Sequence, residues 1–431
     1  MIPTLRLYIL LIAGLVIGCL VAAFAGLGLA FLFLLIFDLA VLLLAFVDSR
    51  RVLQVEVSRK PLERLSIGRE NPITLVVRSQ SQRAKLQIRD SAPFAVLEGL
   101  LELDLRLQST EELTYTVRPT ERGTYAWEAI YLRQLSPWGL AWRNWKVEQS
   151  TTAAVYPDLL ALRELSIKLA FQNTGTLRQS RRFATGTEFA EMREYSPGDD
   201  PRLIDWKATA RTSRPLVRVL EPEQDQTLII LLDRGRLMTA QVAGLKRFDH
   251  ALNTTLALAL AATNRGDRVG VGVFDKQMHT WIAPERGQKQ MSQLLAKLTP
   301  IQPELIEPDY IGAVTRLTSQ QSRRALVVLL TDLIDLTASA ELIVALGRLT
   351  PRYRPFCVTL RDPRIDQQAQ QTSNTLESAY NRAVALDLLA QRQVALAQLK
   401  QRGVLVLDAP ANQISSQLVD RYLRLKARNQ I

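Results

Sequence analysis

An uninterrupted apolar block near the start of the chain sets the first limit on its fold. From Leu7 to Val47 nearly every residue is apolar, and Asp38 is the one acidic interruption. The block holds about 40 residues, or roughly 60 Å of helix, against a hydrocarbon core of roughly 30 Å. Two membrane spans joined by a tight turn fit this length, and small residues at positions 22–28 mark the turn. For Asp38 we expect a hydrogen bond within the hairpin or to a partner helix.

The charges flanking the block predict its orientation. Arg6 precedes the first span, and Arg50 and Arg51 follow the second. Because basic residues stay in the cytoplasm, both ends of this hairpin should lie inside, with the large remaining portion. Ala23-Phe24-Ala25 also fits a cleavage site, which would make the first span a removed signal and the second a stop-transfer segment. Both interpretations leave the rest of the chain in the cytoplasm, and the basic residues 50, 51, 59 and 60 should attract anionic lipid headgroups.

Composition excludes several classes of site. The chain has two cysteines and two histidines, too few for a disulfide framework or a closed zinc site, which needs about four ligands. The formal net charge of +12 is spread along the sequence without an arginine-aromatic stripe. We therefore expect no nucleic acid among the partners, whereas the lipid bilayer is one. No phosphate-binding loop, dinucleotide fingerprint or nucleophile elbow occurs in the sequence.

After the hairpin (residues 1–50), residues 51–155 predict a β-sandwich-like domain. Apolar residues alternate with polar ones, which is typical of half-buried antiparallel strands; the alternating sets are Leu53-Val55-Val57, Ile73-Leu75-Val77, Leu86-Ile88, Leu101-Leu103-Leu105-Leu107 and Leu113-Tyr115-Val117. Aromatic residues gather between Tyr125 and Trp145, at positions 127, 131, 138, 142 and 145. We interpret them as core rather than as a ligand groove.

Residues 186–211 carry a specific motif inside a predicted linker of residues 156–225. The motif reads GTEFAEMREYSPGDDPRLIDWKATAR. This segment resembles the signature of the bacterial family catalogued as domain of unknown function 58. The resemblance implies the same order of parts throughout the chain: a two-span anchor in the inner (plasma) membrane, a β-domain, this signature and a von Willebrand factor A-like domain. It also implies a MoxR-type AAA+ ATPase as partner.

The residues of the motif favour a binding or bracing role. Asp199 or Asp200 can cap a short helix with Pro201 in its first turn, which would place Arg202 and Asp205 on one helix face and Trp206 as a buried anchor. Nearly balanced charge suits an ion-paired brace between domains, a charged docking face, or a carboxylate site that binds a metal and hydrolyses a substrate. The candidate residues for partner binding or interdomain contact are Glu188, Arg193, Tyr195, Asp199, Asp200, Arg202, Asp205, Trp206 and Arg211.

Residues 226–431 predict an α/β domain with a parallel sheet covered on both faces. Apolar strands at 228–232, 269–274, 325–330, 356–360 and 404–407 alternate with helix-compatible segments at 245–263 and 288–298. Residues 279–282 suit a short edge strand, and 376–403 a covering helix ended by Gly403. Ligands in such sheets bind at the carboxyl ends of strands, where Asp233 and Asp332 fall.

These aspartates match a degenerate metal-ion-dependent adhesion site (MIDAS) of the von Willebrand type. The family motif D-x-S-x-S reads Asp233-Arg234-Gly235-Arg236-Leu237, so both serine ligands are missing. Asp332 matches the later aspartate, and Asp309 can add a carboxylate. Mg²⁺ prefers six oxygens, and the neighbouring arginines repel a cation. We expect no cofactor and propose that an arginine replaces the metal and bridges the aspartates.

Together these features predict a non-enzymatic, membrane-tethered adaptor on the cytoplasmic face that works with a MoxR-type ATPase. One alternative is a metal-dependent hydrolase that uses the carboxylates of residues 186–211. Another is a membrane scaffold for cell-envelope assembly, whose partners would be other membrane or envelope proteins.

Overall fold

The computed structural model describes residues 2–50, 55–62, 64–79, 84–94, 96, 101–105, 110–179, 188–221, 226–333, 339–371 and 375–428. The predictions made for Arg51, Leu53, Leu107 and residues 186–187 fall outside these ranges. The chain divides into two compact units, Met1–Tyr156 and Pro157–Ile431, each described by itself.

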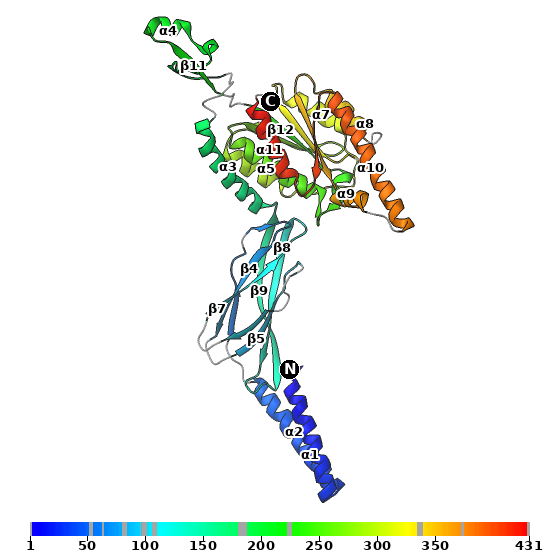
Figure 1. The fold of residues 1–431 in the computed structure, drawn as a ribbon. Helices are drawn as coiled ribbons and strands as arrows, with labels where there is room; N and C mark the ends of the chain where they lie inside the picture. Colours follow the sequence, from blue (N-terminus) through cyan, green and yellow to red (C-terminus); the bar gives the residue numbers. More distant parts are fainter. Residues whose placement is uncertain are drawn as a thin grey trace. The chain divides into compact units, whose positions relative to one another are not determined.

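The first unit begins with two long apolar helices (Figure 1). They are α1 (Leu5–Ala25) and α2 (Leu27–Arg50), and Gly26 separates them, as the small residues predicted. Both are long and apolar enough to cross a membrane, by length and composition. Gly14 and Gly18 allow the two helices to pack closely. A Cβ on Gly14 would lie 2.4 Å from the Phe37 ring, and a Cβ on Gly18 would lie 2.7 Å from the Leu34 side chain. The hydrogen bond expected for Asp38 within the hairpin is absent for its Oδ1, which is buried without a partner among the described residues.

Two antiparallel sheets follow in the same unit (Figure 1). One has the order β1-β9-β8-β5-β6, with β3 parallel to β9, and the other has the order β2-β4-β7. Their strands are β1 (Ile2–Pro3), β2 (Val55–Arg59), β3 (Leu65–Ser66), β4 (Asn71–Ser79), β5 (Ala84–Asp90), β6 (Leu101–Leu105), β7 (Thr110–Val117), β8 (Gly123–Leu135) and β9 (Ala141–Tyr156). The predicted alternation of apolar and polar residues is thus realised as strands.

A buried polar cluster joins the two sheets. Asp90 of β5 accepts hydrogen bonds from Arg59 Nε of β2 at 2.9 Å and from Tyr115 OH of β7 at 2.5 Å. Trp127 Nε1 donates to Tyr115 OH at 3.3 Å. Burial raises the pKa of the Tyr115 hydroxyl well above its usual value, and Asp90 adds to the rise. The expectation that Arg59 contacts lipid headgroups is therefore wrong, since its side chain is fully buried against a carboxylate.

The aromatic stretch is only partly core. Trp127 is completely buried, as predicted, but the side chains of Tyr131 and Trp138 are 51% and 45% exposed. Tyr131 lies on the outward face of the sheet, because neighbouring residues of a strand point to opposite faces and the adjacent Leu132 points inward. Trp138 lies in the turn between β8 and β9, where no sheet covers it.

The second unit contains a six-stranded sheet of order β16-β15-β12-β17-β18-β19. All neighbouring strands are parallel except β16, which pairs antiparallel with β15 at the edge. The strands are β12 (Thr227–Asp233), β15 (Arg268–Phe274), β16 (Met278–Glu285), β17 (Leu326–Thr331), β18 (Arg354–Arg361) and β19 (Leu405–Pro410). The predicted parallel sheet is present in the predicted segments.

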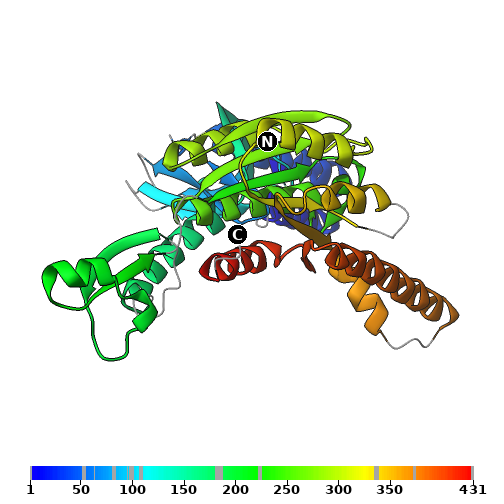
Figure 2. The same ribbon diagram turned by 90° about the horizontal axis from the view of Figure 1, so that it is seen from above.

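Helices cover both faces of this sheet (Figures 1 and 2). Ile230 and Leu232 of β12 pack with α5 (Arg247–Thr263), α6 (Gln288–Leu298), α11 (Ile414–Ala427) and α3 (Leu159–Gln179). Ile229 and Leu231 of the same strand pack on the other face with α7 (Tyr310–Gln320), α8 (Ala340–Gly347) and α10 (Leu376–Gln401). Because helices cover both faces of β12, its side chains are buried on both sides and its sequence is an unbroken apolar run, as in parallel sheets generally.

Two helix predictions need correction. Residues 245–246 form strand β14 (Leu245–Lys246), paired with β13 (Gln241–Val242), so α5 begins at Arg247 rather than at Leu245. The covering helix α10 covers the sheet only with its C-terminal half, where Leu396 and Leu399 are buried. Its N-terminal half leaves Leu386 48% exposed and contacts α9 (Pro363–Gln370); Figure 2 shows this half extending beyond the sheet.

Candidate functional site

The first candidate site is the signature module, which we define as residues 188–221. Strands β10 (Glu188–Glu194) and β11 (Leu216–Glu221) form an antiparallel pair, and the 3-10 helix η2 (Pro201–Leu203) and helix α4 (Trp206–Thr212) lie in the connection between them (Figure 1). Backbone hydrogen bonds tie this connection to the strands, because Tyr195 N donates to Pro215 O and Asp205 N to Leu216 O, both at 2.9 Å. The segment predicted as a linker is thus a small folded structure.

Each aspartate of the motif has a structural partner. Asp199 pairs with Arg193 at 2.5 Å and accepts from Ser196 N at 2.9 Å, so the Arg193 guanidinium and this backbone N–H hold the pKa of Asp199 below its usual range. Asp200 caps η2 by accepting from Arg202 N at 3.0 Å, which confirms the predicted cap.

Asp205 has two roles at once. Its Oδ1 accepts from the backbone N–H groups of Lys207 and Ala208 at 3.0 Å each and caps α4. Its Oδ2 contacts Arg218 of β11 at 2.6 Å. The backbone N–H of Ala208 and the Arg218 guanidinium lower the pKa of the Asp205 carboxyl. The expectation that Arg202 and Asp205 share a helix face is wrong, because η2 ends at Leu203 and Asp205 begins a second helix.

The predicted burial of Trp206 is also wrong, because its side chain is 70% exposed. Trp206 is the first residue of α4. Phe189 and Met192 of β10 are exposed too, at 58% and 43%. The module therefore presents large apolar side chains to its surroundings, while its three aspartates contact its own backbone and arginines.

The remaining charges of the module divide into paired and unpaired groups. Glu194 pairs with Arg214 at 2.9 Å. Arg202, Lys207 and Arg211 are exposed, and the part of the chain that the structure describes offers their side chains no ion-pair partner. Glu188 lies in β10, but its side chain is outside the described residues. Sequence reasoning missed Arg214 and Arg218, which lie beyond the motif and become its partners only through strand pairing.

The second candidate site is the carboxyl edge of the parallel sheet. Asp233, at the end of β12, is completely buried. Its Oδ2 accepts from Thr331 Oγ1 at 2.6 Å and from Tyr310 OH at 3.1 Å, and its Oδ1 accepts from Gly235 N at 2.7 Å. Burial raises the pKa of Asp233 to about 6, although the three donors oppose the rise. A Cβ on Gly235 would lie 2.8 Å from the backbone oxygen of Ile306, so the loop itself excludes a serine at this motif position.

Asp332, after β17, is held by two arginines. Its Oδ1 accepts from Arg392 of α10 at 2.9 Å, and its Oδ2 pairs with Arg247 of α5 at 2.8 Å. Arg392 also pairs with Asp408 of β19 at 2.8 Å and donates to the carbonyl of Leu333. Burial opposes the charge on Arg392, but the two carboxylates together raise the pKa of its guanidinium.

Each of the three predicted MIDAS aspartates has hydrogen-bond or ion-pair partners of its own. Asp309 caps α7 by accepting from Gly312 N at 2.6 Å. No group of three or more histidine, cysteine or acidic side chains suited to a metal occurs within the described ranges. The predicted arginine that bridges Asp233 and Asp332 is not present among those residues either, because hydroxyl groups contact Asp233.

The arginines next to the motif are engaged elsewhere. Arg234 pairs with Asp275 at 2.7 Å and also with Glu304, and Arg236 pairs with Glu307 at 2.6 Å. The arginines that contact Asp332 come from positions 247 and 392, which carry no sequence signal for this role.

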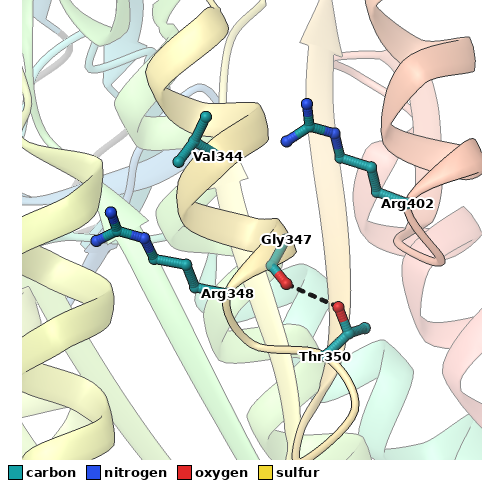
Figure 3. Close-up of a pocket in the computed structure, with 5 residues that line it drawn as sticks. All are labelled: Val344, Gly347, Arg348, Thr350 and Arg402. Carbon is teal, nitrogen blue, oxygen red and sulfur yellow. Dashed lines mark hydrogen bonds between the residues drawn. The ribbon is translucent and has the colours of Figure 1, made fainter.

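A surface hollow of about 450 Å³ lies at the C-terminal end of α8 (Figure 3). Val344, Gly347, Arg348, Thr350 and Arg402 line it. Figure 3 shows the guanidinium groups of Arg348 and Arg402 on opposite sides of the helix that carries Val344. Because a binding site needs convergent polar groups, the hollow does not form a third candidate.

Comparisons with known proteins agree with the signature. Residues 191–384 match the family model described as "Protein of unknown function DUF58". Uncharacterized protein Rv1480 of Mycobacterium tuberculosis (strain ATCC 25618 / H37Rv) is 24% identical over 181 residues, which is 42% of this chain and 56% of that protein. Uncharacterized protein YeaD of Bacillus subtilis (strain 168) is 22% identical over 241 residues, 55% of this chain and 58% of the relative. The matches thus span less than three fifths of these curated relatives.

Among solved structures, the conserved hypothetical protein BatB from Bacteroides thetaiotaomicron is similar at a TM-score of 0.33 and 12% identity. That similarity covers 47% of this chain and 99% of the BatB chain.

Proposed function

We propose that this protein is a non-enzymatic, membrane-tethered adaptor whose signature module binds a partner protein. The observation that carries the proposal is the exposed Trp206 above a scaffold of satisfied carboxylates. Tryptophan and arginine are the residues that most often dominate binding energy at protein interfaces, and Trp206 is followed by Lys207 and, one turn later, Arg211. Such a side chain left 70% exposed on a short, capped helix supports a binding role.

The same module gives little support to hydrolysis. A general base requires a pKa near the working pH. Arg193 lowers the pKa of Asp199, and the backbone N–H of Ala208 together with Arg218 lowers the pKa of Asp205. Both carboxylates are also occupied by donors, so a metal would have to displace an arginine from each. The contacts therefore favour a docking face over a catalytic one.

For the partner we propose a MoxR-type AAA+ ATPase. This identification rests on the family resemblance of the signature and not on the geometry of the module. An exposed tryptophan beside Lys207 and Arg211, for which the described residues offer no ion-pair partner, would suit an apolar pocket with an acidic rim.

For the domains we propose a β-sandwich in residues 51–155 and a von Willebrand factor A-like domain in residues 226–431. The two antiparallel sheets joined by the Asp90 cluster support the first assignment. The sheet order, the antiparallel edge strand β16 and the aspartates at the ends of β12 and β17 support the second. In this domain the arginine pairs of Asp332 would replace the metal of related sites.

For the localisation we propose that α1 and α2 cross the inner membrane and that the rest of the chain is cytoplasmic. The start of α1 and the end of α2 both contact the turn between β8 and β9, since Thr4 Oγ1 donates to Gly139 O at 2.7 Å and Trp138 N donates to Asp48 Oδ1 at 3.2 Å. Both helix ends would then lie on the side of the β-domain, and Arg6 and Arg50 favour the cytoplasm for that side.

A membrane scaffold is the second candidate, and Asp38 favours it. Asp38 is a half-buried carboxyl within a span, so a polar group of another membrane helix would satisfy the hydrogen-bonding capacity of its accessible part. Full-length protein should then recover other membrane proteins, and Asp38→Leu should lose them while leaving any ATPase bound.

The adaptor proposal is tested by affinity purification of the tagged full-length protein from gently solubilised membranes, with mild crosslinking and ATP, followed by mass spectrometry. We expect an AAA+ ATPase that Trp206→Ala loses. Tyr380→Ala is the matched control, because Tyr380 lies on α10 and is also 70% exposed. Recovery of the ATPase in equal amounts from the Trp206 variant would contradict the docking role of the module.

A further inference from the structure

The turn between β8 and β9 connects the folded domain of the first unit to both apolar helices. Thr4, just before α1, donates from Oγ1 to Gly139 O at 2.7 Å and to Leu140 O at 3.0 Å. Asp48, in the last turn of α2, accepts from Trp138 N at 3.2 Å. The Leu140 side chain packs with Leu7, Val41 and Ala45 of the two helices. The tip of the β8–β9 hairpin is therefore fixed to the helix ends on both sides.

Strand pairing strengthens this connection. Ile2 and Pro3 of β1 pair with Trp142 and Ala141 at the start of β9. The residues before α1 thus extend the same sheet whose hairpin contacts α2. These contacts fix the position of the β8–β9 turn along the axes of α1 and α2.

The lengths of α1 and α2 place the β8–β9 turn at the boundary of the membrane. The 21 residues of α1 measure roughly 31 Å, which matches a hydrocarbon core of roughly 30 Å. The 24 residues of α2 measure roughly 36 Å, so its last turn extends beyond the core. Asp48, Ser49 and Arg50 lie in that last turn, next to the β8–β9 turn, at the level of the lipid headgroups.

The side chains around the turn are those that suit this level. Trp138 is 45% exposed and follows Pro137 in the turn. The guanidinium of Arg6 lies against Gly139, since a Cβ on that glycine would come within 2.8 Å of Arg6 Nη1. Arg143 donates to the carbonyl of Ser49 at 3.5 Å, and Arg50 stacks over the Phe46 ring at 4.5 Å.

The charge of this surface is positive. Arg6, Arg50 and Arg143 are exposed, whereas Asp48, the acidic residue that contacts the turn, is completely buried. Tryptophan is enriched at membrane interfaces, and exposed arginines there attract anionic lipids.

We propose that the β8–β9 turn is a lipid-contacting collar, in which Trp138 enters the interfacial layer and Arg6, Arg50 and Arg143 bind the phosphates of anionic headgroups. The collar rests on the proposed membrane anchoring of α1 and α2. It adds that the β-domain stands directly on the membrane surface instead of hanging from a loose tether. It also replaces the predicted lipid contact of Arg59, which is buried in the domain.

The position of Trp138 is tested with full-length protein in nanodiscs whose lipids carry a nitroxide close to the headgroup. We expect quenching of tryptophan fluorescence in the wild type, and Trp138→Phe should reduce the quenched fraction by about half or more, because interfacial tryptophans lie at headgroup depth. Trp206→Phe, which removes an exposed tryptophan of the other unit, should leave the absolute amount of quenched emission unchanged. Equal quenching in wild type and Trp138→Phe would overturn the proposal.

The charge preference is tested by the association of spin-labelled phosphatidylglycerol relative to phosphatidylcholine. The wild type should prefer phosphatidylglycerol, and the Arg6→Gln/Arg143→Gln variant should lose about fivefold of this preference per arginine at low salt. Arg78→Gln/Arg89→Gln removes the same charge from exposed positions on β4 and β5 and should change little. With the wild-type protein, the preference for phosphatidylglycerol should also fall as the salt concentration is raised. A preference insensitive to both salt and the first variant would overturn the collar.

Alkaline carbonate extraction of native membranes separates this proposal from the anchoring on which it rests. Wild-type protein that stays in the membrane but shows neither quenching nor lipid preference contradicts the collar alone. Release of the protein into the supernatant contradicts the membrane anchoring itself.

Discussion

Arg392 donates from Nη1 to Oδ1 of Asp332 across 2.9 Å, so a guanidinium of α10 occupies the carboxyl edge of the sheet beside β17. The same guanidinium pairs with Asp408 of β19, and Arg247 neutralises the second oxygen of Asp332. Residues of α5, α10 and β19 and the end of β17 are thereby joined at one point. This relationship makes the edge a structural ion-pair network in the folded protein.

Replacing Arg392 by Gln should strongly destabilise the second unit. The substitution removes the positive charge that pairs with Asp332, whose side chain is 3% exposed, and with Asp408. Breaking such a buried ion pair costs about 3 kcal/mol or more. Denaturant unfolding measures the loss. Arg348→Gln removes an exposed arginine of the same unit and should change the free energy of unfolding by less than about 0.5 kcal/mol. Similar small effects for both variants would show that the network adds nothing to stability.

Mg²⁺ should not stabilise the wild-type protein. Arg392 and Arg247 already occupy both oxygens of Asp332, and hydroxyl and backbone donors occupy Asp233. A ligand that binds only the folded state raises its melting temperature, which makes thermal unfolding with and without Mg²⁺ the measurement. An increase in melting temperature that Asp233→Ala abolishes would contradict the replacement of the metal by arginine.

The stability of the second unit should decrease as the pH rises from about 4 to about 6. Burial raises the pKa of Asp233 from 3.8 to about 6, so the folded state binds this proton more tightly than the unfolded state does. The resulting stabilisation is fully present below the unfolded pKa and is lost as the pH rises through the folded pKa, by about 3 kcal/mol at most.

Asp233→Asn is the variant that isolates this contribution, because an amide does not titrate. The free energy of unfolding, measured by denaturant at a series of pH values, should vary less between pH 4 and 6 in the variant than in the wild type. Parallel pH profiles for the two proteins would show that Asp233 does not titrate in this range.

Two adjacent basic residues in the first unit should differ sharply in their effect on stability. Arg59→Gln leaves the buried Asp90 without its cation and should cost about 3 kcal/mol or more. Lys60→Gln breaks an exposed pair with Glu112, whose side chains are 48% and 55% exposed, and should cost less than about 1 kcal/mol. Unfolding of the two variants under identical conditions gives the comparison, and equal losses would contradict the buried role of Arg59.

Asp205→Ala should loosen the start of α4. The substitution removes the cap from the backbone N–H groups of Lys207 and Ala208 and the partner of Arg218. Hydrogen exchange at those two amides should accelerate by about fivefold to tenfold, as expected when a helix loses its N-cap. Asp200→Ala is the matched control, since Asp200 caps the separate helix η2. If only the amides of η2 exchange faster in both variants, the assigned cap of α4 is wrong.

The sequence by itself determined the features that depend on local pattern. An apolar block with small residues at its centre predicts two helices with a turn between them, and the turn is at Gly26. Unbroken apolar runs predict strands buried on both faces, and β12 and β17 are such strands. Asp200 is a further example, because an aspartate immediately before a proline favours a helix cap whatever surrounds it.

Only the tertiary structure decided which charges meet and which side chains are covered. Arg392 reaches Asp332 across 60 positions, Arg59 reaches Asp90 in another sheet, and Trp206 is left exposed. None of these outcomes follows from spacing, since an arginine near an aspartate in sequence competes with every other cation that folding brings closer. Periodicity determines which face of an element is apolar, whereas the pairing of ions depends on distances that exist only after the elements have packed.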